Sequence, residues 1–191
     1  NAQSTGSLQL SNASTLVIGS ELGVGHIRSS FGSGQATASG TAAIADVGDV
    51  QMATGLLVGR NFVEDNVVAH ATGTLAMDRI GSVDVGGDFD IGQTGVSSLQ
   101  ASVTGQATGI GSATVRDVTG QFAVAGDIDV GQTSAVAGAT ATGSGNLVME
   151  RIGSLSVVGD LDLGQTGAQG TLFGTGAASL RSISSVTIGA N

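Results

Sequence analysis

Residues 145–166 read GNLVMERIGSLSVVGDLDLGQT, and residues 73–94 read GTLAMDRIGSVDVGGDFDIGQT. Fourteen of the 22 positions are identical between the two stretches. Weaker copies begin at Gly6, Gly40, Gly111 and Gly176. Successive copies therefore start 34, 33, 38, 34 and 31 residues apart. Self-similarity at such a period is typical of repeat architectures, in which each copy is one structural unit.

Apolar residues alternate with other residues at a period of two inside each copy. In the first copy the apolar pairs are Leu8 with Leu10, Leu16 with Ile18, and Leu22 with Val24, and the later copies keep the same class at aligned positions. Such alternation buries one face of a β-strand. In a helix that packs on its neighbours, apolar residues recur three and four positions apart. No segment shows that spacing, which excludes a helical solenoid.

Stacked copies of one strand-rich unit bury a continuous core that a single unit cannot form. The sequence therefore predicts an all-β fold, a parallel β-solenoid of about six coils with a repeat near 34 residues. We expect residues 1–191 to form one domain, with coils that start near residues 6, 40, 73, 111, 145 and 176. The segments between the third strand of one coil and the next leading glycine are expected to be connectors.

Two local patterns refine this prediction. Coil four has one extra residue between Val118 and Phe122, which predicts a bulge or a longer corner. Upstream of the leading glycines, inward positions hold very small residues such as Ala36, Ala69 and Ala107. Small inward side chains allow two sheets to approach closely, so we expect the solenoid to be flattened along that edge.

Composition limits the classes of partner. The 191 residues carry 15 acidic side chains and six arginines, a net charge of −9, with no lysine or cysteine. This balance disfavours nucleic acid and anionic membrane surfaces as partners. No apolar run approaches the ~20 residues of a membrane span, so membrane insertion is not expected. The sequence has no initiator Met or signal peptide, which indicates a processed form or a piece of a longer chain.

Hydroxyl side chains dominate the outward positions of the long strand near each leading glycine. Regular threonine rows on a β-solenoid resemble the ice-binding face of solenoid antifreeze proteins, which implies ice or a glycan as a ligand. The opposing interpretation is that Thr and Ser simply suit exposed strands. The candidate binding face comprises Thr37, Ser39, Thr41, Thr72, Thr74, Thr108, Ser112, Thr142, Ser144 and Thr175.

Aspartates form two further columns, which we expect to share one outward face. Like charges stacked on neighbouring strands repel, and a hard cation such as calcium relieves that repulsion with oxygen ligands. The alternative is a solvated acidic face that prevents edge aggregation. The repeat is not the Gly-Gly-x-Gly-x-Asp nonapeptide of calcium-binding β-rolls. The candidate calcium ligands are Asp88, Asp90, Asp127, Asp129, Asp160 and Asp162.

Arginines recur five or six residues after the leading glycine, at Arg79, Arg116, Arg151 and Arg181. Acidic residues adjoin three of them, which predicts a ladder of ion pairs along one corner. Catalytic candidates are few. His26 and His70 lie in different parts of the repeat, there is no metal-binding motif, and no nucleophile elbow occurs. The sequence therefore predicts that the protein is not an enzyme and needs no cofactor, with calcium as the one candidate ion.

Lines such as GSLSVVGDLDLGQTG and GQFAVAGDIDVGQTS resemble the repeats of bacterial surface β-solenoids, namely autotransporter passengers and haemagglutinin-like adhesins. The resemblance implies an extracellular or cell-surface structural protein. Both ends carry uncapped core columns, which predicts head-to-tail assembly of copies into a fibre or an adhesin stalk. The alternative is a piece of a longer solenoid whose own coils cover the ends. The predicted assembly residues are Leu8, Leu10, Leu16, Ile18, Leu180, Ile183, Val186 and Ile188.

Overall fold

The computed structural model describes residues 2–28, 34–64, 67–97, 105–135, 140–168 and 171–189. All regular elements in these ranges are β-strands. Within these ranges, no helix has the length and apolar character needed to cross a membrane.

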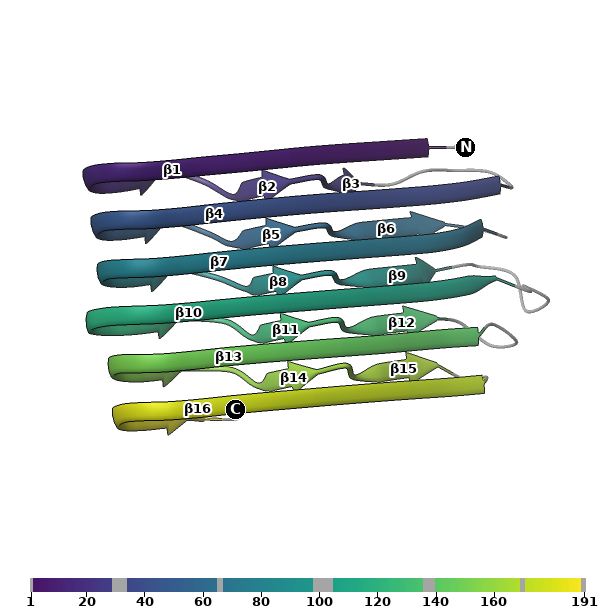
Figure 1. Cartoon of the computed structure of the whole chain (residues 1–191). Coiled ribbons are helices and arrows are strands. Elements are labelled where there is room, and N and C mark those ends of the chain that lie inside the picture. The colour runs from purple at the N-terminus through teal and green to yellow at the C-terminus, as the bar shows by residue number, and fades with distance from the viewer. Residues whose placement is uncertain are drawn as a thin grey trace.

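Six long strands form the largest sheet, in the parallel order β1-β4-β7-β10-β13-β16, and lie side by side along the stack (Figure 1). The register aligns Gly6 with Gly40, Gly40 with Gly73, and so on to Gly176. The predicted starts of the coils are therefore confirmed. The strands of this long sheet are β1 (Ala2–Ile18), β4 (Gly34–Met52), β7 (Val67–Val85), β10 (Gln106–Val124), β13 (Thr140–Val157) and β16 (Thr171–Ile188).

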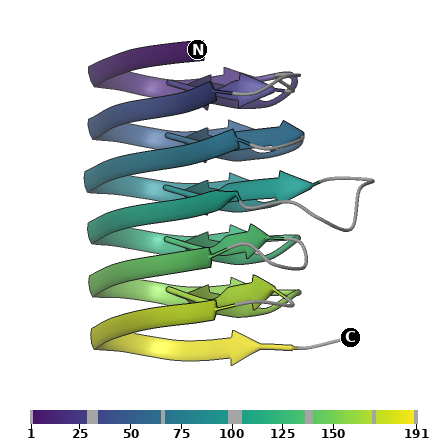
Figure 2. The ribbon, with the colours of Figure 1, turned by 90° about the vertical axis from the view of Figure 1, so that its right-hand side faces the viewer.

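Two further parallel sheets have five strands each, and one strand from each of them completes a turn. The second sheet comprises β2 (Leu22–Val24), β5 (Leu56–Val58), β8 (Phe89–Ile91), β11 (Ile128–Val130) and β14 (Leu161–Leu163). The third comprises β3 (Ile27–Arg28), β6 (Asn61–Glu64), β9 (Thr94–Ser97), β12 (Thr133–Ala135) and β15 (Thr166–Ala168). Viewed along the strands, successive turns stack as a spiral that ends with β16 (Figure 2). The chain is a parallel β-solenoid, as predicted.

The third sheet corrects one expectation. The segments that follow the second sheet were predicted to be connectors, but each begins with a strand that pairs with its equivalents in neighbouring turns. The buried positions of these strands include the polar residues Asn61, Thr94 and Thr133, so apolar alternation does not reveal the strands. The remaining parts of these segments, which include residues 29–33 and 98–104, lie outside the described residues.

Each long strand bends once, at a residue with positive φ. The six residues at this corner have φ between 53° and 60°, and none is a glycine: Asn12, Asp46, Arg79, Asp117, Arg151 and Ser182. The bend directs the two halves of the strand onto different sides of the turn. The inward residues of both halves and of the second sheet then face one another in the main core.

The main core contains the predicted columns in the predicted order. Phe122 lies beside Leu155 in the next coil, and its ring meets that of Phe89 edge-on at 5.6 Å between centroids. The register shifts between Val118 and Gln121, which confirms the predicted bulge in coil four. Side chains in these columns are at most 3% exposed in coils two to four and on β13. Leu161 and Leu163 on β14, at the end of the second sheet, are half-buried.

A second, smaller core lies between the long sheet and the third sheet. It contains small residues, including Ala36, Ala69 and Ala107, against Val63 and Val96. The predicted close approach is therefore confirmed, and glycines make it possible. A Cβ atom on Gly40 would lie only 2.2 Å from the carbonyl oxygen of Val24. This close contact between backbones lies between the main core and the smaller core.

Candidate functional site

The two aspartate columns do not share one outward face, which corrects the prediction from sequence. Asp88 and Asp160 are exposed, whereas Asp90 and Asp129 are buried at 0% and 5% exposure. Because side chains two positions apart lie on the same face of a strand, Asp90 was expected to face solvent like Asp88. The structure instead covers it with the segment that follows the strand.

The outer column, which contains Asp88, Asp127 and Asp160, forms hydrogen bonds between successive coils. The backbone N–H of Asp127 donates to Asp88 Oδ1 at 3.2 Å, and the N–H of Asp160 donates to Asp127 Oδ1 at 2.8 Å. Each carboxylate thus satisfies a backbone donor of the next coil. The residue before each donor must be small, since a Cβ atom on Gly159 would lie 1.9 Å from Asp127 Oδ1. The Gly-Asp pair in the repeat therefore serves this inter-coil contact.

The inner column is covered because the chain kinks after the second sheet before it continues in the same direction into the third sheet (Figure 1). The glycine that ends each short strand has φ between 61° and 69°, at Gly25, Gly59, Gly92, Gly131 and Gly164. At this kink, the side chain of the residue after the glycine lies over the outer side of the short strand. In the first coil, a Cβ atom on Gly23 would lie 3.5 Å from His26 Nδ1. In later coils the equivalent positions form a polar cluster that we call the seam: Asp90, Asp129, Asp162, Arg60, Gln93, Gln132 and Gln165.

Hydrogen bonds in the seam run from each coil to the next. Gln93 Nε2 donates to Asp129 Oδ2 at 3.0 Å and to Gln132 Oε1 at 2.7 Å. Gln132 Nε2 repeats the pattern toward Asp162 Oδ2 at 3.4 Å and Gln165 Oε1 at 3.1 Å. The glutamines therefore form a ladder that supplies one donor to each carboxylate of the following coil.

Arg60 occupies the glutamine position in coil two and supplies charge as well. Its Nε lies 3.3 Å from Asp90 Oδ2, and its guanidinium carbon lies 4.5 Å from the centre of the Phe62 ring. The pair is an ion pair without a directed hydrogen bond, since neither Arg60 Nε nor Asp90 Oδ2 has a hydrogen-bond partner in the part of the chain that the structure describes. Arg60 is the one arginine among the seven residues of the seam, against three aspartates.

Burial raises the pKa of all three aspartates of the seam. The pKa of Asp129 rises to about 8, because of desolvation first and then the charges of Asp90, Asp162, Asp127 and Asp88. The pKa of Asp90 rises to about 7 through desolvation, which the charge of Arg60 partly offsets. The same burial raises the pKa of Asp162. Asp90 on β8 and Asp129 on β11 face each other in register, so their carboxyl groups titrate as a coupled pair.

These pKa values predict that the protein loses stability as pH rises from 5 to 8. A carboxyl group has a pKa near 4 in the unfolded chain, so the folded state holds more protons throughout this range. The free energy of unfolding should fall by on the order of a few kcal/mol, as measured by denaturant titration with EDTA present. Asp129→Asn should remove most of this slope.

The matched control for the pH slope is Asp84→Asn, which removes an exposed carboxylate from another face. Both histidines are present in the wild type and in the two variants, so their contribution to the pH dependence of stability cancels in the comparison. The ion-paired Asp46 and Asp117 have lowered pKa values, so their contribution is lost only at more acidic pH. An equal slope in wild type and Asp129→Asn would contradict the burial of the pair.

The hydroxyl face lies where the sequence placed it. All ten predicted binding residues point away from the core on the long sheet, and the inward residues between them are buried on β4, β7, β10 and β13. The pairing puts Thr37, His70 and Thr108 in one column, and Thr41, Thr74 and Ser112 in another. Exposed Ile110 and Phe173 interrupt the face. Its role as a binding surface stays a prediction.

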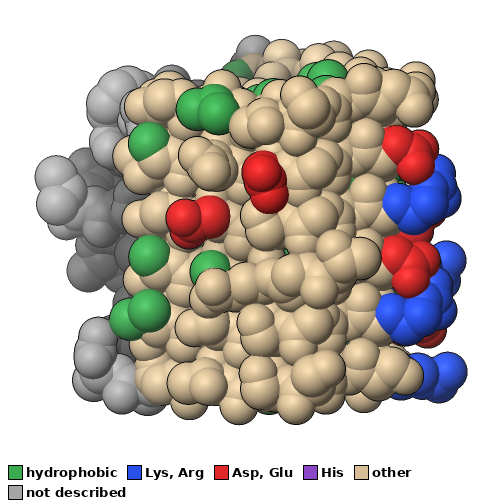
Figure 3. Space-filling view, turned by 90° about the vertical axis from the view of Figure 1, so that its left-hand side faces the viewer, with side chains coloured by type: hydrophobic (Ala, Val, Ile, Leu, Met, Phe, Trp, Pro, Cys, Tyr) green, Lys and Arg blue, Asp and Glu red, His purple; other side chains and the backbone are tan. Residues whose placement is uncertain are grey.

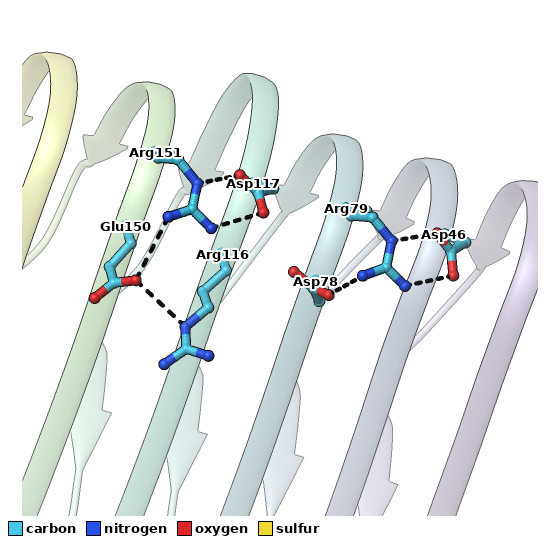
Figure 4. Close-up of polar contacts among 7 residues, drawn as sticks. All are labelled: Asp46, Asp78, Arg79, Arg116, Asp117, Glu150 and Arg151. Atoms are coloured by element: carbon cyan, nitrogen blue, oxygen red, sulfur yellow. Dashed lines mark hydrogen bonds and ion pairs between the residues drawn. The ribbon is translucent and has the colours of Figure 1, made fainter.

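The predicted corner ladder is confirmed, and its charges alternate. Figure 3 shows acidic and basic side chains in a row along one edge, and Figure 4 shows the contacts. Arg79 binds Asp46 of the preceding coil through two nitrogens, and Arg151 binds Asp117 in the same way, each with a 2.8 Å contact from Nη2. Along the same edge, Arg116 Nε lies 3.4 Å from Glu150. This alternation opposes a shift of one coil against the next.

The predicted assembly residues divide into two groups. Leu8, Leu10, Leu16 and Ile18 on β1 are half-buried against the core of coil two. On β16, Leu180, Val186 and Ile188 are 39%, 48% and 42% exposed, and Ile183 is half-buried. Their counterparts one coil earlier are at most 2% exposed. The end strands therefore present the core columns to solvent.

Sequence reasoning missed Arg60 and the glutamines of the seam. The available signal was the repeated Gly-Gln-Thr that follows each Asp-x-Asp-x stretch, at residues 92–94, 131–133 and 164–166. Recognition of that signal required knowing that the chain kinks at the glycine.

No family model, curated protein or solved structure matches the chain. The fold itself defines a parallel β-solenoid. In the described residues, no three His, Cys, Asp or Glu side chains form a group that could hold a metal ion.

Proposed function

We propose that this protein is a non-enzymatic structural β-solenoid of the cell surface or extracellular space, in which copies stack end to end in a fibre or adhesin stalk. The observation that carries the proposal is the exposure of core columns on β16, where Leu180, Val186 and Ile188 are 39–48% exposed. A sheet edge of 18 residues with exposed apolar side chains favours pairing with another strand. The occupant we propose is β1 of a second copy.

The repeat positions make β1 a suitable partner for β16. Stacking one more coil in the same register would place Leu10 over Leu180, Leu16 over Val186, and Ile18 over Ile188. At the corner, Arg181 would meet Ser11, so no like charges would oppose each other. The contact would form through the long sheet, which has six strands where the other two sheets have five. Such a contact is heterologous and propagates into a filament.

The proposal predicts that the double variant Leu180→Asp with Ile188→Asp remains a single subunit. Both side chains are exposed in an isolated subunit, so the change should leave its melting temperature nearly unaffected. In a stack they would become buried, and an unpaired buried charge opposes association strongly. Sedimentation velocity and negative-stain microscopy at ~100 µM protein measure the outcome, with filaments expected for the wild type.

Val158→Asp is the matched control, because Val158 is 49% exposed and lies on neither end strand. It should assemble like the wild type. If the wild type stays monomeric, end-to-end stacking of this chain is wrong. If filaments persist in the double variant, the contact between copies must be lateral.

A second candidate function uses the hydroxyl face as a binding surface for ice or a glycan. It is favoured by the parallel register, which repeats Thr and Ser columns at the ~4.8 Å spacing of strands. Thermal hysteresis or glycan-array binding by a monomeric wild type would favour this function over the structural one.

A further inference from the structure

The seam contains buried oxygen atoms that have no hydrogen-bond partner among the described residues. Both carboxylate oxygens of Asp90, Oδ1 of Asp129 and Oε1 of Gln93 are buried without a hydrogen-bond partner. The three residues are 0%, 5% and 6% exposed. Buried polar atoms are ordinarily paired, and each unpaired carboxylate oxygen is costly. At a pH at which the two carboxyl groups are ionised, four acceptors close together attract a positive charge.

The amide of Gln93 is held at the carboxylates. Its Nε2 donates to Asp129 Oδ2 at 3.0 Å, which fixes the amide group beside that carboxylate. Rotation of this amide by half a turn would present Oε1 instead of Nε2 to a cation at the carboxylate. Asp90 and Asp129 are direct neighbours across β8 and β11. Two carboxylates and one amide group thus come together between coils three and four.

The chain neutralises only part of this charge. Arg60 pairs with Asp90, but no second cationic side chain belongs to the seam. Asp88 and Asp127 lie nearby on the same edge and add to the negative potential at Asp90 and Asp129. The field at the pair therefore favours binding of a further positive charge.

We propose that Asp90, Asp129 and Gln93 bind a divalent cation of the calcium type between coils three and four. Hard cations take carboxylate and amide oxygens as ligands. Equivalent atoms on neighbouring strands are ~4.8 Å apart, which is close to twice a calcium–oxygen distance of 2.3–2.6 Å and longer than twice that of magnesium. Calcium also tolerates irregular geometry and completes its coordination with water. The cation would join successive coils.

Calcium addition tests the site directly. Protein freed of metal with EDTA and exchanged into buffer at pH 8 should gain several degrees in melting temperature with CaCl2, and the gain should saturate. Calorimetric titration should show one calcium per chain. MgCl2 at the same ionic strength should bind at least tenfold more weakly.

Variants separate a bound ion from general charge screening. Asp129→Asn keeps the shape of the side chain but should lose at least tenfold in calcium affinity, and Asp90→Asn provides an independent second variant. Asp160→Asn removes an exposed carboxylate from the outer column and should retain the response. Far-UV circular dichroism verifies that each variant is folded. The proposal is overturned if CaCl2 at ~10 mM has no effect on the wild type. It is also overturned if Asp129→Asn responds like the wild type.

Discussion

Leu155→Asp is expected to unfold the C-terminal coils and to remove at least about 4 kcal/mol of stability. Leu155 is 2% exposed and pairs in register with Phe122 on one side and Val186 on the other. A carboxylate at this position would have apolar neighbours and no cation. Because each coil is stabilised mainly by its neighbours, the loss should spread beyond coil five.

Thermal unfolding followed by circular dichroism measures this loss, and hydrogen exchange identifies the coils that open. Ser156→Asp is the matched control, since Ser156 is the next residue on β13 and points outward between Ala123 and Thr187. It should melt within a few degrees of the wild type. A normal melting temperature for Leu155→Asp would contradict the assignment of the main core.

Gly131→Ala is expected to cost more than about 3 kcal/mol, although it adds only one methyl group. Gly131 has φ of 69°, and a Cβ atom there would lie 1.9 Å from the carbonyl oxygen of Ser144. Both atoms belong to backbone that is fixed by parallel pairing. The turn would have to open, which would separate the two cores and uncover the seam.

Gly167→Ala is the matched control, because a Cβ atom at Gly167 would have no atom within 4 Å. This variant should keep its melting temperature or gain slightly through a less flexible unfolded chain. Chemical denaturation of both variants measures the difference. Equal stability of the two would show that the backbones do not approach as closely as the structure indicates.

The kink at the glycines connects the fold to the candidate cation site. At this kink, Gly92 and Gly131 place Gln93 and Gln132 over aspartates that would otherwise face water. The same glycines allow the second sheet to pack closely against the long sheet. A change at these glycines should therefore weaken calcium binding and lower stability together, whereas Asp129→Asn should weaken calcium binding without lowering stability.

Much of the fold could be predicted because equivalent contacts recur in several copies of the repeat. The columns that contain Leu155 and Phe122, the bulge after Val118 and the corner ion pairs of Arg79 and Arg151 all follow from aligned positions. In a parallel stack, aligned positions become neighbours, so alignment of the copies already predicts contacts between coils. A charge in one copy and the opposite charge in the next thus predict an ion pair.

The sequence by itself determined the solenoid, its period and its inward columns, because alternation and repetition are local properties of the chain. Only the tertiary structure decided that Asp90 and Asp129 are buried whereas Asp88 and Asp160 are exposed. Alternation assigns a residue to a face of its strand, but it does not tell whether another segment covers that face. The cover here comes from the kink at glycines such as Gly92, which lies against the backbone of the long sheet. Contacts between segments that are distant in the sequence therefore decide which residues are covered.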